Sequence, residues 1–164
     1  FSTACAHTDR GESSGEKLNI VWQPTFEAEN DLSVQPKIDG VNIVSPSWLI
    51  VMDANGFIQD TIDEEYVKNA HQKGYKVWPL ITNNFDKDLT HAFLNDKHAR
   101  DYIVRQMTAY AKKYKFDGYN FDFENIYESD RELLNQFMLE ATKALHDINV
   151  KVSIDVTAPM DDSQ

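Results

Sequence analysis

Residues 116–124 read Phe-Asp-Gly-Tyr-Asn-Phe-Asp-Phe-Glu, and the rest of the interpretation is built outward from this stretch. Successive side chains of an extended strand point to opposite faces, so Asn120, Asp122 and Glu124 share one face. The aromatic residues between them share the other face, which can be buried. Two carboxyl groups on one face share a local field, which should drive their pKa values apart. One carboxyl could then hold a proton as a general acid while the other stays ionised.

Two simpler interpretations of this pattern stay open. Alternating polar and apolar residues also describe a half-exposed strand with a solvated face. Pairs of acids can also ligate a hard cation such as calcium or magnesium. The surrounding chain favours an active site, because acids at the carboxyl end of a parallel strand lie where the active sites of barrels are found.

The flanking sequence predicts alternating strands and helices. Five apolar runs predict strands, over residues 18–26, 41–51, 76–82, 116–124 and 151–157. Three helices are predicted between them, over residues 61–74, from 95 or 96 to about 114, and from a capping box at 129–132 to about 145. This alternation indicates a right-handed parallel arrangement of β/α units.

The fold class is therefore α/β, and two architectures fit the number of strands. An open doubly wound sheet is one, but no glycine-rich turn follows the first strand, which argues against nucleotide binding. The other is a (β/α)8 TIM barrel, which usually needs about 250 residues. A chain of 164 residues has room for about five of the eight units, so we expect an incomplete barrel. Residues 1–16 are small and polar and are expected to be a disordered leader or linker.

Composition narrows the classes of partner. The formal net charge is −11, from 27 acids and 16 bases, which argues against nucleic acid or an anionic membrane surface. No run approaches the roughly 18 apolar residues of a membrane span. The single cysteine, Cys5, excludes an intrachain disulfide, and the five histidines form no spaced cluster. We therefore expect no metal and no cofactor.

Residues Asp117 to Glu124 resemble the Asp-Gly-x-Asp-x-Asp-x-Glu signature of glycoside hydrolase family 18, the chitinase-like hydrolases. The string FDGYNFDFENIY, followed by a helix and VSIDVTAP, is most similar to the bacterial spore-germination and cortex-lytic branch. The resemblance covers about residues 17–160. It implies that residues 17–164 are the N-terminal part of a catalytic barrel, with Asp117 and Gly118 as structural positions of the motif.

The resemblance also implies a mechanism and a substrate. Glu124 would be the general acid and base, and Asp122 would orient the 2-acetamido group of the substrate, which itself attacks the anomeric carbon. The substrate would be a polysaccharide containing N-acetylglucosamine, peptidoglycan in preference to chitin. The protein would be secreted or associated with the cell envelope or spore, and cell-wall-binding domains could lie elsewhere in the parent chain.

Asn120 departs from the family pattern, which has aspartate there. The amide could still hydrogen-bond Asp122 in an active enzyme, or the change could mark a catalytically inactive sugar-binding protein. A scaffold or germination-factor role without sugar binding is a third possibility. Because Asp122 and Glu124 are both present, the sequence favours the enzyme.

Further candidate residues for substrate binding follow from their places at strand ends. They are Trp48, Asn83, Asn125, Tyr127 and Asp155. Trp48 could stack on a sugar ring or lie in the core. Asn83 could bind hydroxyl groups or form part of a turn. The Ser-x-Gly-Gly pattern of many chitinases is missing from the third strand, whereas Asp155 is expected to point into the barrel.

Overall fold

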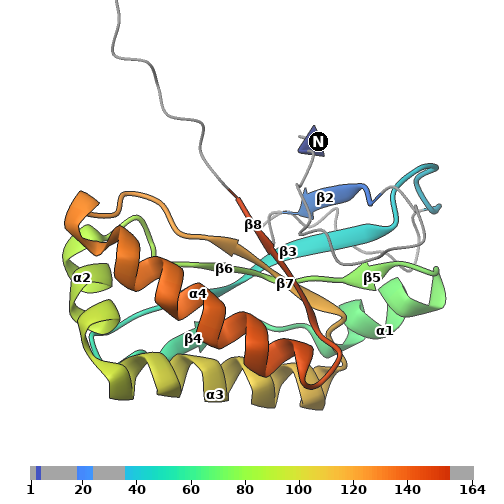
Figure 1. The fold of residues 1–164 in the computed structure, drawn as a ribbon. Helices are drawn as coiled ribbons and strands as arrows, with labels where there is room; N and C mark the ends of the chain where they lie inside the picture. Colours follow the sequence, from blue (N-terminus) through green and yellow to red (C-terminus); the bar gives the residue numbers. More distant parts are fainter. Residues whose placement is uncertain (1–2, 5–17, 24–35, 156–164) are drawn as a thin grey trace, which may run out of the picture.

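A curled sheet of parallel strands forms the centre of the fold in the computed structural model, which describes residues 3–4, 18–23 and 36–155 (Figure 1). The parallel strands follow one another in chain order: β2 (Ile20–Gln23), β3 (Ile43–Val51), β5 (Lys76–Val77) with β6 (Leu80–Thr82), β7 (Gly118–Asp122) and β8 (Lys151–Ile154). The five predicted strands are thus confirmed as neighbours in a parallel half-barrel, although 24–26 and 156–157 lie outside the described residues.

Two short antiparallel strands were not predicted. Strand β4 (Ile58–Asp60) folds back on β3 as a hairpin. Strand β1 (Thr3–Ala4) pairs with β2, so these two residues belong to the sheet and not to a leader outside it. The other residues of the expected leader, Cys5 included, lie outside the described residues.

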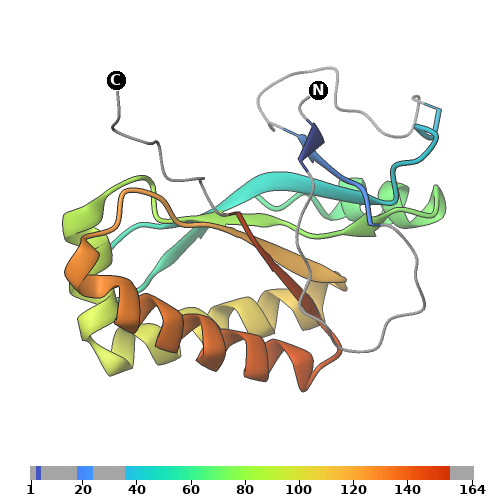
Figure 2. The same ribbon diagram turned by 45° about the horizontal axis from the view of Figure 1, so that its top comes forward.

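The helices cover one face of the sheet (Figures 1 and 2). They are α1 (Glu64–Gln72), α2 (Lys87–Asn95), α3 (Lys97–Tyr114) and α4 (Arg131–His146), the last preceded by the 3-10 helix η1 (Glu128–Asp130). Their apolar sides form one core with the outward side chains of the strands. The strands contribute Val44, Val77, Ile81, Tyr119 and Phe121 to this core. The opposite, inner face carries a smaller cluster of Ile20, Ile43 and Trp78.

Helix starts agree only in part with the predicted caps. Asp96 caps α3 as expected, because its side chain accepts from the backbone N–H of His98. Helix α1 begins later than its predicted capping box, since Asp63 and not Thr61 is the N-cap. The predicted box at 129–132 is not formed: Asp130 caps α4 without a side-chain hydrogen bond. Helix α2, capped by Asp86, was not predicted.

The third parallel strand is interrupted in its middle. Residues 76–82 were predicted as one strand, but Trp78 and Pro79 separate β5 from β6. Proline has no N–H to donate to the ladder, which accounts for the break. A second irregularity, a register shift between Ser47 and Leu49 in β3, places Trp48 and Leu49 in the same helix-covered core.

Candidate active site

The site is built on β7, whose two faces differ as the sequence predicted. Tyr119 and Phe121 are fully buried against the helices, and the Tyr119 hydroxyl donates to the backbone oxygen of Met107 at 2.6 Å. Asn120 and Asp122 alternate with them and so point to the inner face. The strand ends at Asp122, two residues earlier than predicted, and Glu124 lies in the connection that follows.

Asp122 is half-buried at the carboxyl end of β7, and one of its oxygens, Oδ1, has no hydrogen-bond partner in the described structure. Its pKa is raised from 3.8 to about 6, first by burial, then by the negative charges of Glu124 and Asp155, and by a hydrogen bond with Glu124. The raised pKa means that Asp122 retains affinity for a proton near neutral pH.

Strand β8 brings a third carboxyl group to the same place. The last pair of the β7–β8 ladder joins Phe121 and Ile154, and the N–H of Asp155 donates to the backbone oxygen of Phe121 at 2.8 Å. Asp155 is therefore next to Asp122 across the ladder. Burial raises its pKa and so does the charge of Glu124, whereas a hydrogen bond from Asn120 lowers it.

Asn120 is buried and connects β7 to β8. Its Nδ2 donates to Oδ2 of Asp155 at 3.1 Å, and its Oδ1 accepts from the Ser153 hydroxyl at 2.9 Å. The expected hydrogen bond from this amide to Asp122 is replaced by contacts with the neighbouring strand. An amide here can donate to Asp155, which an ionised aspartate could not do.

Glu124 is partly exposed, and its backbone is held from the preceding β/α unit. Asn83 follows β6 and is fully buried. The Nδ2 of Asn83 donates to the backbone oxygen of Glu124 at 2.8 Å, and its Oδ1 accepts from the Glu124 N–H at 3.2 Å. Asn83 was predicted to bind substrate; its amide is instead committed to the chain, so this prediction is corrected.

Trp48 is also corrected as a candidate for substrate binding. Only 2% of it is exposed, and its ring packs against Tyr66 and Phe116 in the helix-covered core. The core interpretation of Trp48, which the sequence left open, is the one that the structure supports. No face of this indole is available to a sugar ring.

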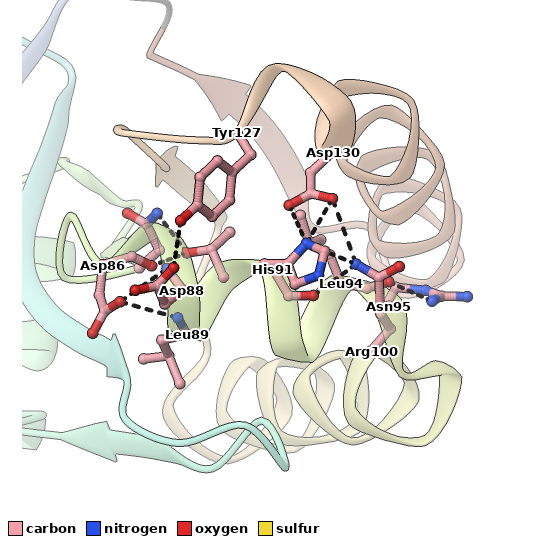
Figure 3. Close-up of polar contacts among 11 residues, drawn as sticks. Asp86, Asp88, Leu89, His91, Leu94, Asn95, Arg100, Tyr127 and Asp130 are labelled. Carbon is pink, nitrogen blue, oxygen red and sulfur yellow. Dashed lines mark hydrogen bonds and ion pairs between the residues drawn. The ribbon is translucent and has the colours of Figure 1, made fainter.

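Asn125 and Tyr127 are exposed in the connection from β7 to α4, but both are engaged by the preceding loop and helix. The Nδ2 of Asn125 donates to the backbone oxygen of Phe85 at 2.7 Å. The Tyr127 hydroxyl donates to the Asp88 carboxylate of α2 (Figure 3). Lys87 lies over the Tyr127 ring. These contacts join the connection between β7 and α4 to the loop and helix that follow β6.

The same connection is fastened to α2 by a second set of contacts (Figure 3). Asp130 is buried, and its carboxylate oxygens lie 2.8 and 3.0 Å from Nδ1 of His91. Asn95 of α2 adds a longer contact, from its Nδ2 to Oδ1 of Asp130 at 3.5 Å. This explains why Asp130 does not cap α4 with its side chain: its carboxylate is used between helices.

Asp117 and Gly118 have contacts of the kind that a structural role requires. Oδ2 of Asp117 accepts from the backbone N–H of Val77 at 2.9 Å and lies 2.7 Å from Nε2 of His71. A β-carbon on Gly118 would lie 2.6 Å from the indole of Trp78, so only glycine fits there without movement. Asp117 therefore joins the start of β7 to β5 and α1, and Gly118 leaves room for the Trp78 indole.

Two residues at the site were not singled out from the sequence. Ser153 precedes Asp155 by two residues, and that spacing on one strand face would have indicated it. Phe85 lies in the connection between β6 and α2, is 52% exposed and has a φ of 55°. An aromatic residue directly after an Asn-Asn pair at a strand end was the available signal.

Neither a metal centre nor a membrane span is apparent in the described part of the chain. Within residues 3–4, 18–23 and 36–155, no three His, Cys, Asp or Glu side chains gather to hold a metal ion. Among the helices of these residues, none is both long and apolar enough to cross a bilayer.

Curated relatives resemble parts of the chain. It is 28% identical over 118 residues to a Bacillus subtilis protein named as the glycosylase YvbX, a match that covers 68% of this chain and 34% of that protein. It is 32% identical over 78 residues to the cortical fragment-lytic enzyme of Bacillus subtilis, covering 45% of this chain and 18% of that enzyme. The chain thus spans about a third or less of the length of these relatives.

Solved structures share the fold. The C-terminal domain of a protein named as a chitinase from Desulfitobacterium hafniense superposes with a TM-score of 0.75 at 23% identity, covering 90% of this chain and 48% of that one. The spore cortex-lytic enzyme SleL of Bacillus megaterium gives 0.72 at 18% identity, covering 88% and 35%. At these identities the likeness concerns the half-barrel alone.

A family model adds the assignment. The model described as glycosyl hydrolase family 85 matches residues 63–155, which include α1 to α4 and strands β5 to β8. This match confirms the prediction of a glycoside hydrolase family. It does not show the narrower resemblance to family 18. Since the model matches more than half of its residues, the chain belongs to glycosyl hydrolase family 85.

Proposed function

We propose that this chain carries the catalytic acids of a glycosidase that cleaves β-linked polysaccharide containing N-acetylglucosamine. The observation that supports this most is the Asp122 carboxyl group, which is half-buried beside Glu124 and has its pKa raised to about 6. Coupled carboxyl groups with separated proton affinities are the requirement for acid–base chemistry near neutral pH. They lie at the carboxyl end of β7, where parallel strands of barrels present their active sites.

The proposed mechanism is the substrate-assisted one of family 18. Glu124 donates its proton to the glycosidic oxygen as the bond to the anomeric carbon breaks. The carbonyl oxygen of the substrate's 2-acetamido group bonds to that carbon, giving an oxazolinium ion, and the Asp122 carboxylate accepts a hydrogen bond from its N–H. Glu124 then takes a proton from water, whose oxygen opens the oxazolinium ring. The two displacements retain the anomeric configuration.

The shared field of the acids suits this cycle. Burial and the charges of Glu124 and Asp155 raise the pKa of Asp122 to about 6, so most Asp122 carboxyl groups are ionised at neutral pH, as this mechanism requires. When positive charge develops on the acetamido group, ionised Asp122 stabilises it in a partly desolvated place. Asn120 and Ser153 fix Asp155 at one side of the pair, where its charge raises the pKa of Asp122.

We propose peptidoglycan in preference to chitin as the substrate. The curated relatives support this choice, since one of them is named as a cortical fragment-lytic enzyme. A substrate of that kind also fits a protein that is secreted or associated with the envelope or spore of a bacterium. Residues 17–164 would then be the N-terminal part of the catalytic barrel, and cell-wall-binding domains elsewhere in the same gene product would fit this role.

A catalytically inactive, carbohydrate-binding protein is the second candidate. Asn120 favours it, because the family 18 signature has aspartate there and the amide is hydrogen-bonded into β8. Such a protein would bind oligosaccharide and release no reducing ends.

The test is a reducing-end assay of the full gene product on peptidoglycan and on chitin oligomers, beside the isosteric variant Glu124→Gln. General acid–base assistance is typically worth about 10²- to 10⁴-fold, so we expect the variant to lose at least about 100-fold in kcat. Binding of oligosaccharide should persist in both proteins. Equal turnover by a correctly folded Glu124→Gln protein would refute the role of Glu124, and binding without turnover in the wild type would favour the second candidate.

A further inference from the structure

At the carboxyl ends of the strands, the side chain of Asn83 makes hydrogen bonds of the kind that a neighbouring strand makes. The β6–β7 ladder ends with the pair Thr82 and Asp122, so no backbone pairing from β6 reaches Glu124. The amide of Asn83 takes over there, because it binds both the N–H and the carbonyl oxygen of Glu124, at 3.2 and 2.8 Å. One primary amide thus supplies the two hydrogen bonds that two peptide groups of a neighbouring strand would otherwise make.

The amide of Asn83 is itself held in one orientation. Its Nδ2 also donates to the hydroxyl of Thr90 at 2.8 Å, and its Oδ1 also accepts from the N–H of Phe85 at 3.3 Å. The Thr90 hydroxyl donates in turn to the backbone oxygen of Asp86 at 2.6 Å. Rotating the amide by half a turn would set its oxygen against two acceptors, so only one orientation satisfies every partner.

Burial makes this arrangement rigid. Asn83 has no exposed surface and Thr90 has 1%, so a lost hydrogen bond here is not replaced cheaply by water. Asn125 reinforces the connection from the other side by donating to the backbone oxygen of Phe85. Residues 83–85 and 124–125 are therefore joined as one unit at the mouth of the half-barrel.

From these contacts we infer that Asn83 is the positioning residue of Glu124: it holds the backbone of the acid beyond the end of β7, so that the Glu124 carboxyl stays beside Asp122. The effect on reaction rate rests on the proposed function, whereas the effect on geometry does not. Asn83 touches no substrate in this scheme. Its influence passes through the peptide groups of Glu124.

The first test is Asn83→Ala in the full gene product, compared with Thr90→Val. The alanine variant releases both peptide groups of Glu124. The valine variant keeps the shape of Thr90 and both Glu124 contacts but removes two hydrogen bonds from the same buried cluster. A displacement of about 1 Å can cost about 100-fold in rate, so Asn83→Ala should lower kcat by roughly 10- to 100-fold with KM little changed. Thr90→Val should lower the melting temperature and should lower kcat less than Asn83→Ala does, because both Glu124 contacts of Asn83 remain.

A readout without substrate separates this inference from the proposed function. The pKa of Asp122, followed by carboxyl-carbon NMR, should fall in Asn83→Ala, because Glu124 contributes both a charge and a hydrogen bond that raise it. Thr90→Val should shift the pKa of Asp122 less than Asn83→Ala does. If the wild type hydrolyses nothing but the pKa still falls, the proposed function fails and the positioning role stands. If the wild type is active and Asn83→Ala matches Thr90→Val in kcat and in the Asp122 pKa, the positioning role is overturned.

A second variant covers the case in which Asn83→Ala does not fold. Asn83→Asp keeps the volume and the oxygen that accepts from Glu124 and Phe85, but it places an oxygen against the carbonyl of Glu124. A fall in kcat of about 10-fold or more at unchanged KM supports the inference. Wild-type kcat in folded Asn83→Asp contradicts it.

Discussion

The two faces of β7 are made of alternate residues of one five-residue strand, yet they follow opposite rules. On the outer face every group is satisfied: Phe121 packs against Phe123 and Phe137, and Tyr119 donates its hydroxyl to α3. On the inner face of the described sheet, three buried polar atoms have no partner: Ser45 Oγ, Trp78 Nε1 and Asp122 Oδ1.

Unsatisfied buried polar groups cost stability, and a chain selected for stability alone would avoid them. The comparison indicates a division of labour within the strand. The outer residues hold β7 against the helices, so that the inner residues can keep carboxyl groups in a place where burial raises their pKa. Substitutions on the two faces should therefore separate stability from activity.

The largest expected effect is on the outer face. Phe121→Ala should lower the free energy of unfolding by about 3–5 kcal/mol, because it removes a fully buried ring and leaves a cavity. Urea unfolding of the full gene product measures it. The matched control is Phe85→Ala, since Phe85 is 52% exposed and should change stability by no more than about 0.5 kcal/mol. Equal losses from both variants would show that the outer face has no special part in stability.

The inner face should respond in activity. Asp122→Asn removes the charge that is proposed to stabilise the acetamido group, and we expect kcat to fall by about 100-fold. The free energy of unfolding should stay the same or rise, because a neutral amide is buried more easily than a carboxylate. Kinetics and urea unfolding of the same preparation test both, with exposed Asp39→Asn as control. A destabilised Asp122→Asn protein with the kcat of the wild type would contradict this division of labour.

The smallest expected effect is on the pH dependence of stability. The pKa of Asp122 is 3.8 in the reference state and about 6 in the fold, so the folded protein binds more protons than the unfolded chain between these values. The contribution of Asp122 to stability is therefore highest below about pH 4 and is lost as the pH rises through about 6. Asp155, whose pKa is also raised, acts in the same direction.

Urea unfolding between about pH 4 and about pH 7 measures this contribution. The difference in unfolding free energy between wild type and Asp122→Asn isolates it from the other carboxyl groups. We expect the variant to gain on the wild type as the pH rises. Parallel curves for the two proteins would mean that the fold does not raise the pKa of Asp122.

Much of the fold could be predicted from the sequence because its signals are local. Apolar runs and period-two alternation located the five parallel strands, and the aromatic side of residues 119–123 is buried as predicted. Helix α2 was missed because its nine residues follow a polar turn and carry only three buried side chains, Thr90, Phe93 and Leu94. The break between β5 and β6 could have been predicted, because Pro79 has no N–H to donate, but residues 76–82 were predicted as one strand.

The sequence predicted the residues of the motif itself, but not the contacts that surround them. Asn120 and Asp122 lie on one face of β7, so their spacing was enough to place them together, whereas Glu124 follows the end of the strand and is held by Asn83. Trp48 and Asn83 were assigned to substrate from their places at strand ends, but burial against α1 and hydrogen bonds to Glu124 give them other roles. Such contacts join residues about 20 to 40 positions apart, and no local pattern encodes them.

By itself the sequence determined the α/β class, the order of the strands and the acids of the motif, since alternation along one strand depends on nothing outside it. Only the tertiary structure decided which polar side chains are held by hydrogen bonds within the fold and which remain available to a substrate. In the fold, Asp155 lies next to Asp122 and Asn120 donates to Asp155. Asn83 accepts from the N–H of Glu124 beyond the end of β7. The physical reason is that burial and hydrogen-bond partners depend on neighbouring strands, and those neighbours are distant in the chain.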